Sequence, residues 1–218
     1  MKHLLIAIAS VLLLGCGQPN YDYTSRSENS KNKKSASYLD SSQKANLELF
    51  SAISSNNIKS VKHAIANGAD INSKTKHGLT PLMIAAAAGN VEIANLLAVK
   101  EAELNSNYKG WTSLHRAAFY SNIEIVDFLL EMGLNIDVKD HLGQTPIHWP
   151  ANYGRLIMVN HLISKGADVN VVAKGGAFSG QTPLDAAIKD DQSAVAELLR
   201  KNGGKTAEEL KAEVKCLI

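Results

Sequence analysis

A short motif beginning with Thr recurs at nearly constant spacing along this chain. It stands at Thr80-Pro81-Leu82, Thr112-Ser113-Leu114, Thr145-Pro146-Ile147 and Thr182-Pro183-Leu184. The successive threonines are 32, 33 and 37 residues apart. A second marker keeps the same period, at Asn67-Gly68-Ala69-Asp70, Lys100-Glu101-Ala102-Glu103, Met132-Gly133-Leu134-Asn135 and Lys165-Gly166-Ala167-Asp168. Because two independent markers agree, we expect an array of structural repeats that bury their apolar faces against one another.

Each repeat contains the signals of two helices. Thr is a favoured N-cap residue, and Pro is tolerated at the first helical position because its missing N–H has no helical partner there. Apolar residues then recur at helical spacing, as in the runs from Val91 to Leu97 and from Ile123 to Leu130. The glycines expected to end the second helices in a left-handed conformation are Gly68, Gly133, Gly166 and Gly203. The prediction is an all-α fold.

This pattern resembles the ankyrin repeat, which joins a Thr-Pro-Leu-His-like helix start to a Gly-Ala-Asp-Val-Asn-like turn. The resemblance covers residues 45–204 and implies a solenoid of five helix-turn-helix repeats with short loops or hairpins. The expected repeats are 45–77, 78–109, 110–142, 143–179 and 180–204. The resemblance also implies a structural hydrogen bond near the Thr cap for His115 and His148, and binding of a protein partner in a concave groove.

The two ends of the array depart from the motif in the way a solenoid requires. Residues 45–72 lack the Thr-Pro-Leu start but keep the apolar spacing, so they are expected to form the N-terminal cap. Residues 205–218 are expected to form a C-terminal capping helix. Thr206 and Glu209 match a capping box, and Leu210, Val214 and Leu217 share one helical face.

The N-terminus has the features of a targeting segment. Lys2 and His3 precede an apolar run from Leu4 to Leu14, which is shorter than the roughly 20 residues that span a bilayer. The quartet Leu13-Leu14-Gly15-Cys16 resembles the lipobox of bacterial lipoproteins. This resemblance implies a signal peptide over 1–15 and lipidation of Cys16. The alternative is an ordinary secretory signal with an incidental cysteine.

Residues 16–44 are expected to form a flexible tether, because they are rich in Ser, Asn and Lys and poor in aliphatic side chains. Such a coil reaches roughly 30 Å, enough to hold a domain away from a membrane surface. The expected location is the bacterial cell envelope. Gly17 in place of an Asp favours the periplasmic side of the outer membrane over the inner membrane, if the organism has two membranes.

Charge and motifs exclude several function classes. The formal net charge is +2, from 23 basic and 21 acidic residues, and about −1 remains after Lys44 once Lys2 and residues 17–44 are subtracted. Nucleic acid is therefore not an expected partner. No Walker loop, Gly-x-Ser-x-Gly or His-Glu-x-x-His occurs, and His63, His77, His141 and His161 lack metal-ligand spacing. We predict no catalytic residue, metal or cofactor.

The predicted partner-binding residues lie on the first helices and loops of the third and fourth repeats. Trp, Tyr and Arg dominate interface hot spots, and both Trp residues of the chain fall in this region. The candidates are Trp111, Arg116, Phe119, Tyr120, His141, Leu142, Trp149, Asn152, Tyr153 and Phe178. For Trp111, packing beside its own loop is an equally weighted alternative. Two irregularities border this region: Pro150 inside an expected helix, and a long loop over 171–180.

The sequence thus predicts a monomeric, lipid-anchored module that binds one envelope or periplasmic protein, as an adaptor, an inhibitor or an immunity-like protein. A structural scaffold at the membrane is the main alternative. A hydrolytic enzyme that uses His141 or His148 in the groove is the least favoured hypothesis.

Overall fold

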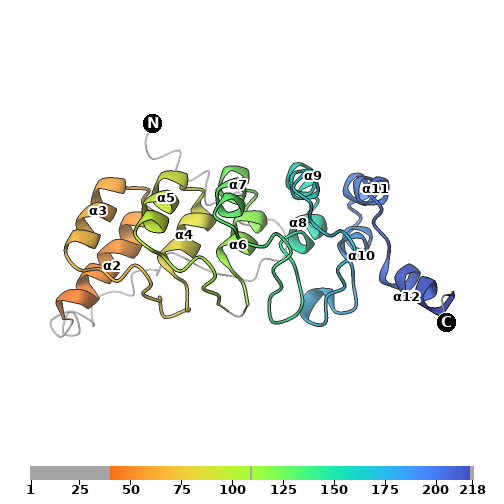
Figure 1. Cartoon of the computed structure of the whole chain (residues 1–218), viewed down its shortest axis with the longest axis horizontal. Coiled ribbons are helices and arrows are strands. Elements are labelled where there is room, and N and C mark those ends of the chain that lie inside the picture. Colours follow the sequence, from red (N-terminus) through yellow and green to blue (C-terminus); the bar gives the residue numbers. More distant parts are fainter. Residues whose placement is uncertain (1–39, 109, 217–218) are drawn as a thin grey trace. The chain divides into compact units, whose positions relative to one another are not determined.

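The structure is a computed structural model that describes residues 40–108 and 110–216. The expected signal peptide, Cys16 and most of the expected tether lie outside the described residues. The described helices follow one another in pairs (Figure 1). These pairs are α2 (Ser41–Ser54) with α3 (Ile58–Ala66), α4 (Pro81–Ala88) with α5 (Val91–Val99), α6 (Ser113–Phe119) with α7 (Ile123–Glu131), α8 (His148–Asn152) with α9 (Leu156–Ser164), and α10 (Pro183–Lys189) with α11 (Ser193–Lys201). The all-α fold and its repeated helix pairs are confirmed.

The pairs stack through two rows of helices. The first helices contact one another in the order α2, α4, α6, α8 and α10, and second helices such as α5 and α7 contact one another in the other row. A continuous apolar core runs between the rows, and leucines from successive pairs are completely buried in it: Leu49, Leu97, Leu114, Leu129, Leu162 and Leu199. Each pair therefore buries its apolar face against its neighbours, as the periodicity predicts.

Local capping explains where the first helices begin. The Thr80 hydroxyl accepts a hydrogen bond of 3.3 Å from the Met83 amide, and Pro81 follows at the first helical position. Thr112 is capped differently, because its amide donates to Nδ1 of His115 over 3.3 Å. The other ring nitrogen of His115 lies 3.1 Å from the Gln144 carbonyl oxygen of the next repeat. The structural role predicted for His115 is confirmed, and the ring also joins two repeats.

The last of the first helices, α10, has a carboxylate at the motif position that is a histidine in α6. Asp185 Oδ2 accepts a hydrogen bond of 2.9 Å from the Thr182 amide and one of 2.8 Å from the Ala207 amide. Asp185 therefore connects its own helix start to the helix that follows the array, α12 (Ala207–Cys216). The expected second-helix ends are also confirmed, since Gly68, Gly133 and Gly166 have φ values of 86°, 88° and 90°.

Pro150 shortens the first helix of its repeat. Helices α4, α6 and α10 begin directly after their Thr, whereas α8 begins only at His148. Pro150 has no N–H to donate to the Pro146 carbonyl, so the first turn after Thr145 cannot complete its helical hydrogen bonds. The predicted disturbance at Pro150 is therefore present as a late helix start.

Both ends of the array differ from the expected boundaries. Helix α2 begins at Ser41 with Asp40 as its N-cap, so the segment expected as tether up to residue 44 contributes its last residues to this helix. The capping box that starts α12 is confirmed, with the Glu209 amide 3.2 Å from the Thr206 hydroxyl. However, Val214 is 58% exposed and Ala207 is the buried residue of this helix. Leu217 lies outside the described residues.

Within the described part of the chain, every helix is too short or too polar to cross a membrane.

Candidate protein-interaction surface

The aromatic residues predicted from the sequence come together on two neighbouring first helices. Trp111 immediately precedes Thr112, the N-cap of α6, Phe119 is the last residue of that helix, and Tyr120 is its C-cap. Trp149 lies in α8, and Tyr153 is its C-cap residue. We call these five residues the aromatic surface. Their convergence follows from the repeat, because equivalent positions of successive first helices lie side by side in the stack.

Trp149 lies at the centre of the aromatic surface. Its ring centroid is 5.7 Å from that of Trp111, 5.8 Å from Phe119 and 5.8 Å from Tyr153. The Trp111 and Phe119 rings meet it edge-on at 62° and 74°, whereas Tyr153 stacks on it at 16°. Both arrangements are favourable for aromatic pairs. The rings thus form one connected patch that spans two repeats.

A polar contact fixes the Trp149 ring in place. Its Nε1 donates a hydrogen bond of 3.0 Å to the side-chain oxygen of Gln144. The Gln144 amide nitrogen donates in turn to the Gly175 carbonyl over 3.4 Å. The indole is therefore held by the loop before α8 and by the long loop that follows α9, so its orientation is set before any partner arrives.

The long loop over 171–180 folds back on the preceding loop. The amides of Lys174 and Gly175 donate to the Leu142 carbonyl over 2.7 and 3.1 Å. This places the short 3₁₀ helix η2 (Gly176–Phe178) beside α8, and the Phe178 ring centroid lies 4.7 Å from that of Trp149. The extra residues of the loop therefore supply an apolar support for the aromatic surface.

The predicted binding residues differ in how much surface they offer. Tyr120 is 37% exposed, His141 is exposed, and Trp111, Phe119, Leu142, Trp149, Asn152 and Tyr153 are partly exposed. Arg116 and Phe178 are buried, at 5% and 2% exposure, which corrects the expectation that they face a partner. Phe178 is covered because its loop folds back, and Arg116 because α6 packs between α4 and α8. Both side chains support the aromatic surface from its buried side.

Trp111 packs beside its own loop, which is the alternative considered from the sequence, and its side chain remains partly exposed. It pairs with Tyr108 in a tight turn, with each amide donating to the other residue's carbonyl over 3.0 Å, and its ring lies 6.1 Å from His115 of its own repeat. The Arg116 guanidinium lies 6.0 Å from the indole centroid, within cation–π range. Its contact with Trp149 then extends this packing into the next repeat.

Among the described residues, His161 belongs to an ion-pair cluster between two second helices. His161 Nε2 lies 2.9 Å from Asp127 Oδ1, which also pairs with Lys165 at 2.6 Å. The hydrogen bond from Lys165 is the main cause that lowers the pKa of Asp127. This cluster links α7 to α9 and was not predicted, although Asp127 and His161 lie about one repeat apart. The described residues include no group of three or more metal-binding side chains.

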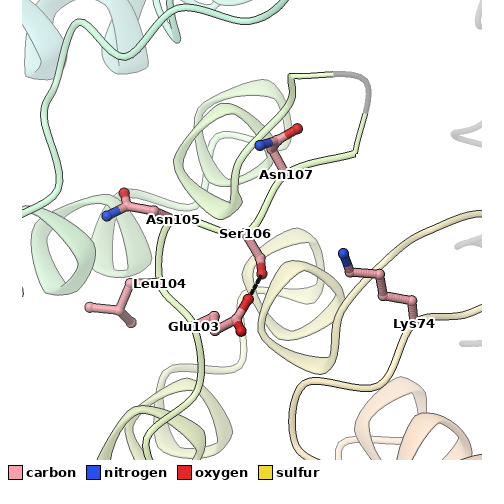
Figure 2. A pocket seen from close by; sticks show the side chains of 6 residues that line it. All are labelled: Lys74, Glu103, Leu104, Asn105, Ser106 and Asn107. Atoms are coloured by element: carbon pink, nitrogen blue, oxygen red, sulfur yellow. Dashed lines mark hydrogen bonds between the residues drawn. The ribbon is translucent and has the colours of Figure 1, made fainter.

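A shallow polar hollow lies between the loops of the first two repeats (Figure 2). Lys74 lies on one side, and residues 103–107 line the other. The Ser106 hydroxyl donates a hydrogen bond of 2.6 Å to Glu103 Oε2, so this acid already has a partner. The hollow is open to solvent, and we assign no chemistry to it.

Comparisons with known proteins agree with the architecture. The model of the family described as ankyrin repeats (3 copies) matches residues 49–140 and 135–209. A homolog of transient receptor potential cation channel subfamily A member 1 from Caenorhabditis elegans is 36% identical over 100 residues, which cover 46% of this chain and 8% of that protein.

Two further relatives extend the comparison. Rat ankyrin repeat and SAM domain-containing protein 6 is 32% identical over 127 residues, covering 53% of this chain and 14% of that protein. An ankyrin repeat protein of fowlpox virus is 33% identical over 156 residues, covering 69% and 46%. The chain thus spans less than half the length of each of these relatives. Ankyrin arrays are protein–protein interaction modules and are generally non-enzymatic. The chain belongs to the ankyrin repeat family.

Proposed function

We propose that this chain binds one protein partner through the aromatic surface. The observation that carries the proposal is the single connected patch of partly exposed rings that Trp149 holds together across two repeats. Aromatic side chains concentrate binding energy at interfaces because they bury a large area for few rotatable bonds. The two most exposed large apolar side chains of the described residues, Val99 and Ile157, are aliphatic residues on second helices, whereas Leu47 and Ile188 are exposed on first helices.

The rigidity of the patch supports the same proposal. Trp149 is bonded to Gln144 and backed by the buried Phe178, so little side-chain freedom remains to be lost when a partner binds. Pre-organisation of this kind improves affinity by reducing the entropy lost on association. The irregular α8 and the long loop both contribute to it, which gives these two departures from the repeat a common role.

The second part of the proposal concerns location. The quartet Leu13-Leu14-Gly15-Cys16 supports lipidation of Cys16, and the polar residues after it support a tether to the array. Acyl chains contribute about 0.8 kcal/mol per buried methylene, and two or more chains give stable anchoring. We therefore infer a lipid-anchored module of the bacterial envelope that acts as a monomer on an envelope or periplasmic protein.

The experiment compares two double variants in a crosslinked pull-down of the full chain from its own envelope. Tyr120→Ala with Tyr153→Ala removes two edges of the aromatic surface, and we expect loss of one dominant partner. Val99→Ala with Ile157→Ala is the matched control, because it removes two exposed apolar side chains from second helices. Helical circular dichroism should be unchanged in both. If several partners persist unchanged in the tyrosine variant, the chain is a scaffold and the proposal fails.

A further inference from the structure

The long loop encloses a small apolar core that is separate from the continuous core of the array. Ala173 and Phe178 of the loop and Ala186 of α10 are buried in it, and Trp149 packs against it. The contact of 4.7 Å between the Phe178 and Trp149 ring centroids joins this small core to the aromatic surface. Because few buried apolar side chains hold it together, we expect the small core to open more readily than the array as a whole.

The backbone of the long loop is suited to such an opening. Among the described residues, its hydrogen bonds to the preceding loop are the two that the Leu142 carbonyl accepts and the one that Gln144 donates to Gly175. Gly176, which begins η2, and Gly180, which follows it, have φ values of 69° and 71°. Glycine adopts this left-handed conformation without strain and gives the backbone freedom at both sites. The loop can therefore hinge there while the helix pairs stay stacked.

His148 lies against the small core and lacks a bond that the equivalent His115 makes. The His148 ring centroid is 5.8 Å from that of Phe178. Nε2 of His115 lies 3.1 Å from the Gln144 carbonyl oxygen of the next repeat, whereas Nε2 of His148 is buried without a hydrogen-bond partner. The ring is thus enclosed by the long loop but is not bonded to it.

Burial keeps the His148 ring neutral. It is the main cause that lowers the pKa of His148 to about 4, and the backbone groups of Gln181 and Val171 and the charge of Asp140 oppose it. The helices packed against α8 carry further titratable or charged residues, namely His115 and Arg116 on α6, His161 on α9, and Asp185 and Lys189 on α10. Among the charged side chains, Asp140 is the one that raises the pKa of His148. The site therefore favours a proton on His148 only when the ring leaves it.

We propose that the long loop is an acid-sensitive support of the aromatic surface. When His148 takes up a proton, Nδ1 becomes a donor and no longer accepts the bond from the Thr145 amide. A cation beside Phe178 and away from water is costly, so the protonated ring turns to solvent and the long loop opens. Phe178 then leaves Trp149, and the aromatic surface loses its backing. This inference rests on the proposed function and adds its regulation, because partner binding weakens as the open state gains population.

The test is hydrogen-exchange mass spectrometry of the purified full chain, without a partner, at pH 7 and pH 5. The quantity compared is the protection factor, which is the slowing of exchange relative to the intrinsic rate at each pH. An open loop gives His148 its ordinary pKa of 6.5, so opening should become about 20-fold more frequent at pH 5. Protection over residues 171–181 should fall by the same factor. At both pH values these amides should be less protected than those of α5, which report opening of the continuous core.

A pair of variants assigns the effect to His148. His148→Gln should remove the pH dependence of protection in the long loop, because glutamine does not titrate. His141→Gln is the matched control, since it replaces an exposed imidazole on the preceding loop and should keep the fall of about 20-fold. Protection in α5 shows whether each variant is folded. If His148→Gln does not fold, the comparison of the long loop with α5 in the unaltered chain still decides the question.

Several results would overturn the inference. Equal protection of the long loop and α5 at both pH values means that the loop opens only when the array unfolds. Protection of the long loop that does not change with pH, or that still falls in a folded His148→Gln variant, means that His148 does not control the opening. Each of these results leaves the proposed function in place, because no partner is present. A failed pull-down, in turn, leaves the opening of the loop in place.

Discussion

The Thr145 amide donates a hydrogen bond of 3.0 Å to Nδ1 of His148, an imidazole that is completely buried. Since Nδ1 accepts this bond, the ring is neutral with its proton on Nε2. Burial is the main cause that lowers the pKa of His148 to about 4, and backbone groups of Thr145, Gln181 and Val171 partly oppose it. Burial also lowers the pKa of His115.

We therefore expect the fold to lose stability in mild acid. Below the ordinary pKa of 6.5 the unfolded chain binds a proton that folded His148 does not, until the pH reaches about 4. The free energy of unfolding should fall by about 3 kcal/mol across this window from His148 alone. Above pH 6.5 this residue adds no pH dependence. Urea denaturation at a series of pH values measures the slope.

Two variants test whether His148 causes the pH dependence of the free energy of unfolding. His148→Gln should reduce it, because glutamine does not titrate, and the part that comes from His115 should remain. His77→Gln, which replaces an exposed side chain, is the matched control. The lowered pKa values of Glu209 and Asp127 do not compete, since those carboxylates lose their contribution only as the pH falls below the ordinary carboxyl range. An unchanged slope in His148→Gln would show that this imidazole is not the source.

Pro150→Ala should stabilise the array. The equivalent residues of the other first helices, Ala85, Ala117 and Ala187, are completely buried alanines, so the site accepts this side chain. The new amide can donate to the Pro146 carbonyl and let α8 begin directly after Thr145. We expect the free energy of unfolding to rise by roughly 1–3 kcal/mol, with more helical circular dichroism. A loss of stability would mean that the proline ring is needed for packing.

Local signals allowed much of this fold to be predicted, because the same signals occur in several repeats. The Thr caps, the histidine roles and the capping box at Thr206 each depend on residues three positions apart. The start of α2 could have been found in the same way, since Asp40 and Gln43 form a capping box. The convergence of the aromatic residues followed from the period alone.

Burial of individual site residues could not be predicted in this way. Phe178 is covered because the long loop bonds to Leu142, a contact between two loops that no local pattern encodes. The ion pairs of Asp127 could not be predicted for the same reason, since they join α7 to α9 through side chains far apart in sequence. Loop insertions change such contacts without changing the periodic markers.

Lipid anchoring is tested at Cys16. A serine at this position cannot form the thioether to lipid, so Cys16→Ser should move the protein from the membrane fraction to the soluble fraction. The array should still fold, because Cys16 lies outside the repeats. Cys216→Ser is the matched control, since it changes the exposed cysteine of α12 and should leave the protein in the membrane fraction. Membrane retention of Cys16→Ser would contradict the proposed anchor.

The central claim is that the aromatic surface contacts the partner, and site-specific photocrosslinking tests it most directly. p-Benzoylphenylalanine replaces Tyr120 in one full-length protein and Ile157, which is 75% exposed on α9, in another. Illumination of intact cells should give one dominant crosslinked species from position 120 and little from position 157. That species should weaken when Tyr153→Ala is added. Equal crosslinking from both positions, or a dominant species from position 157 alone, would contradict the claim.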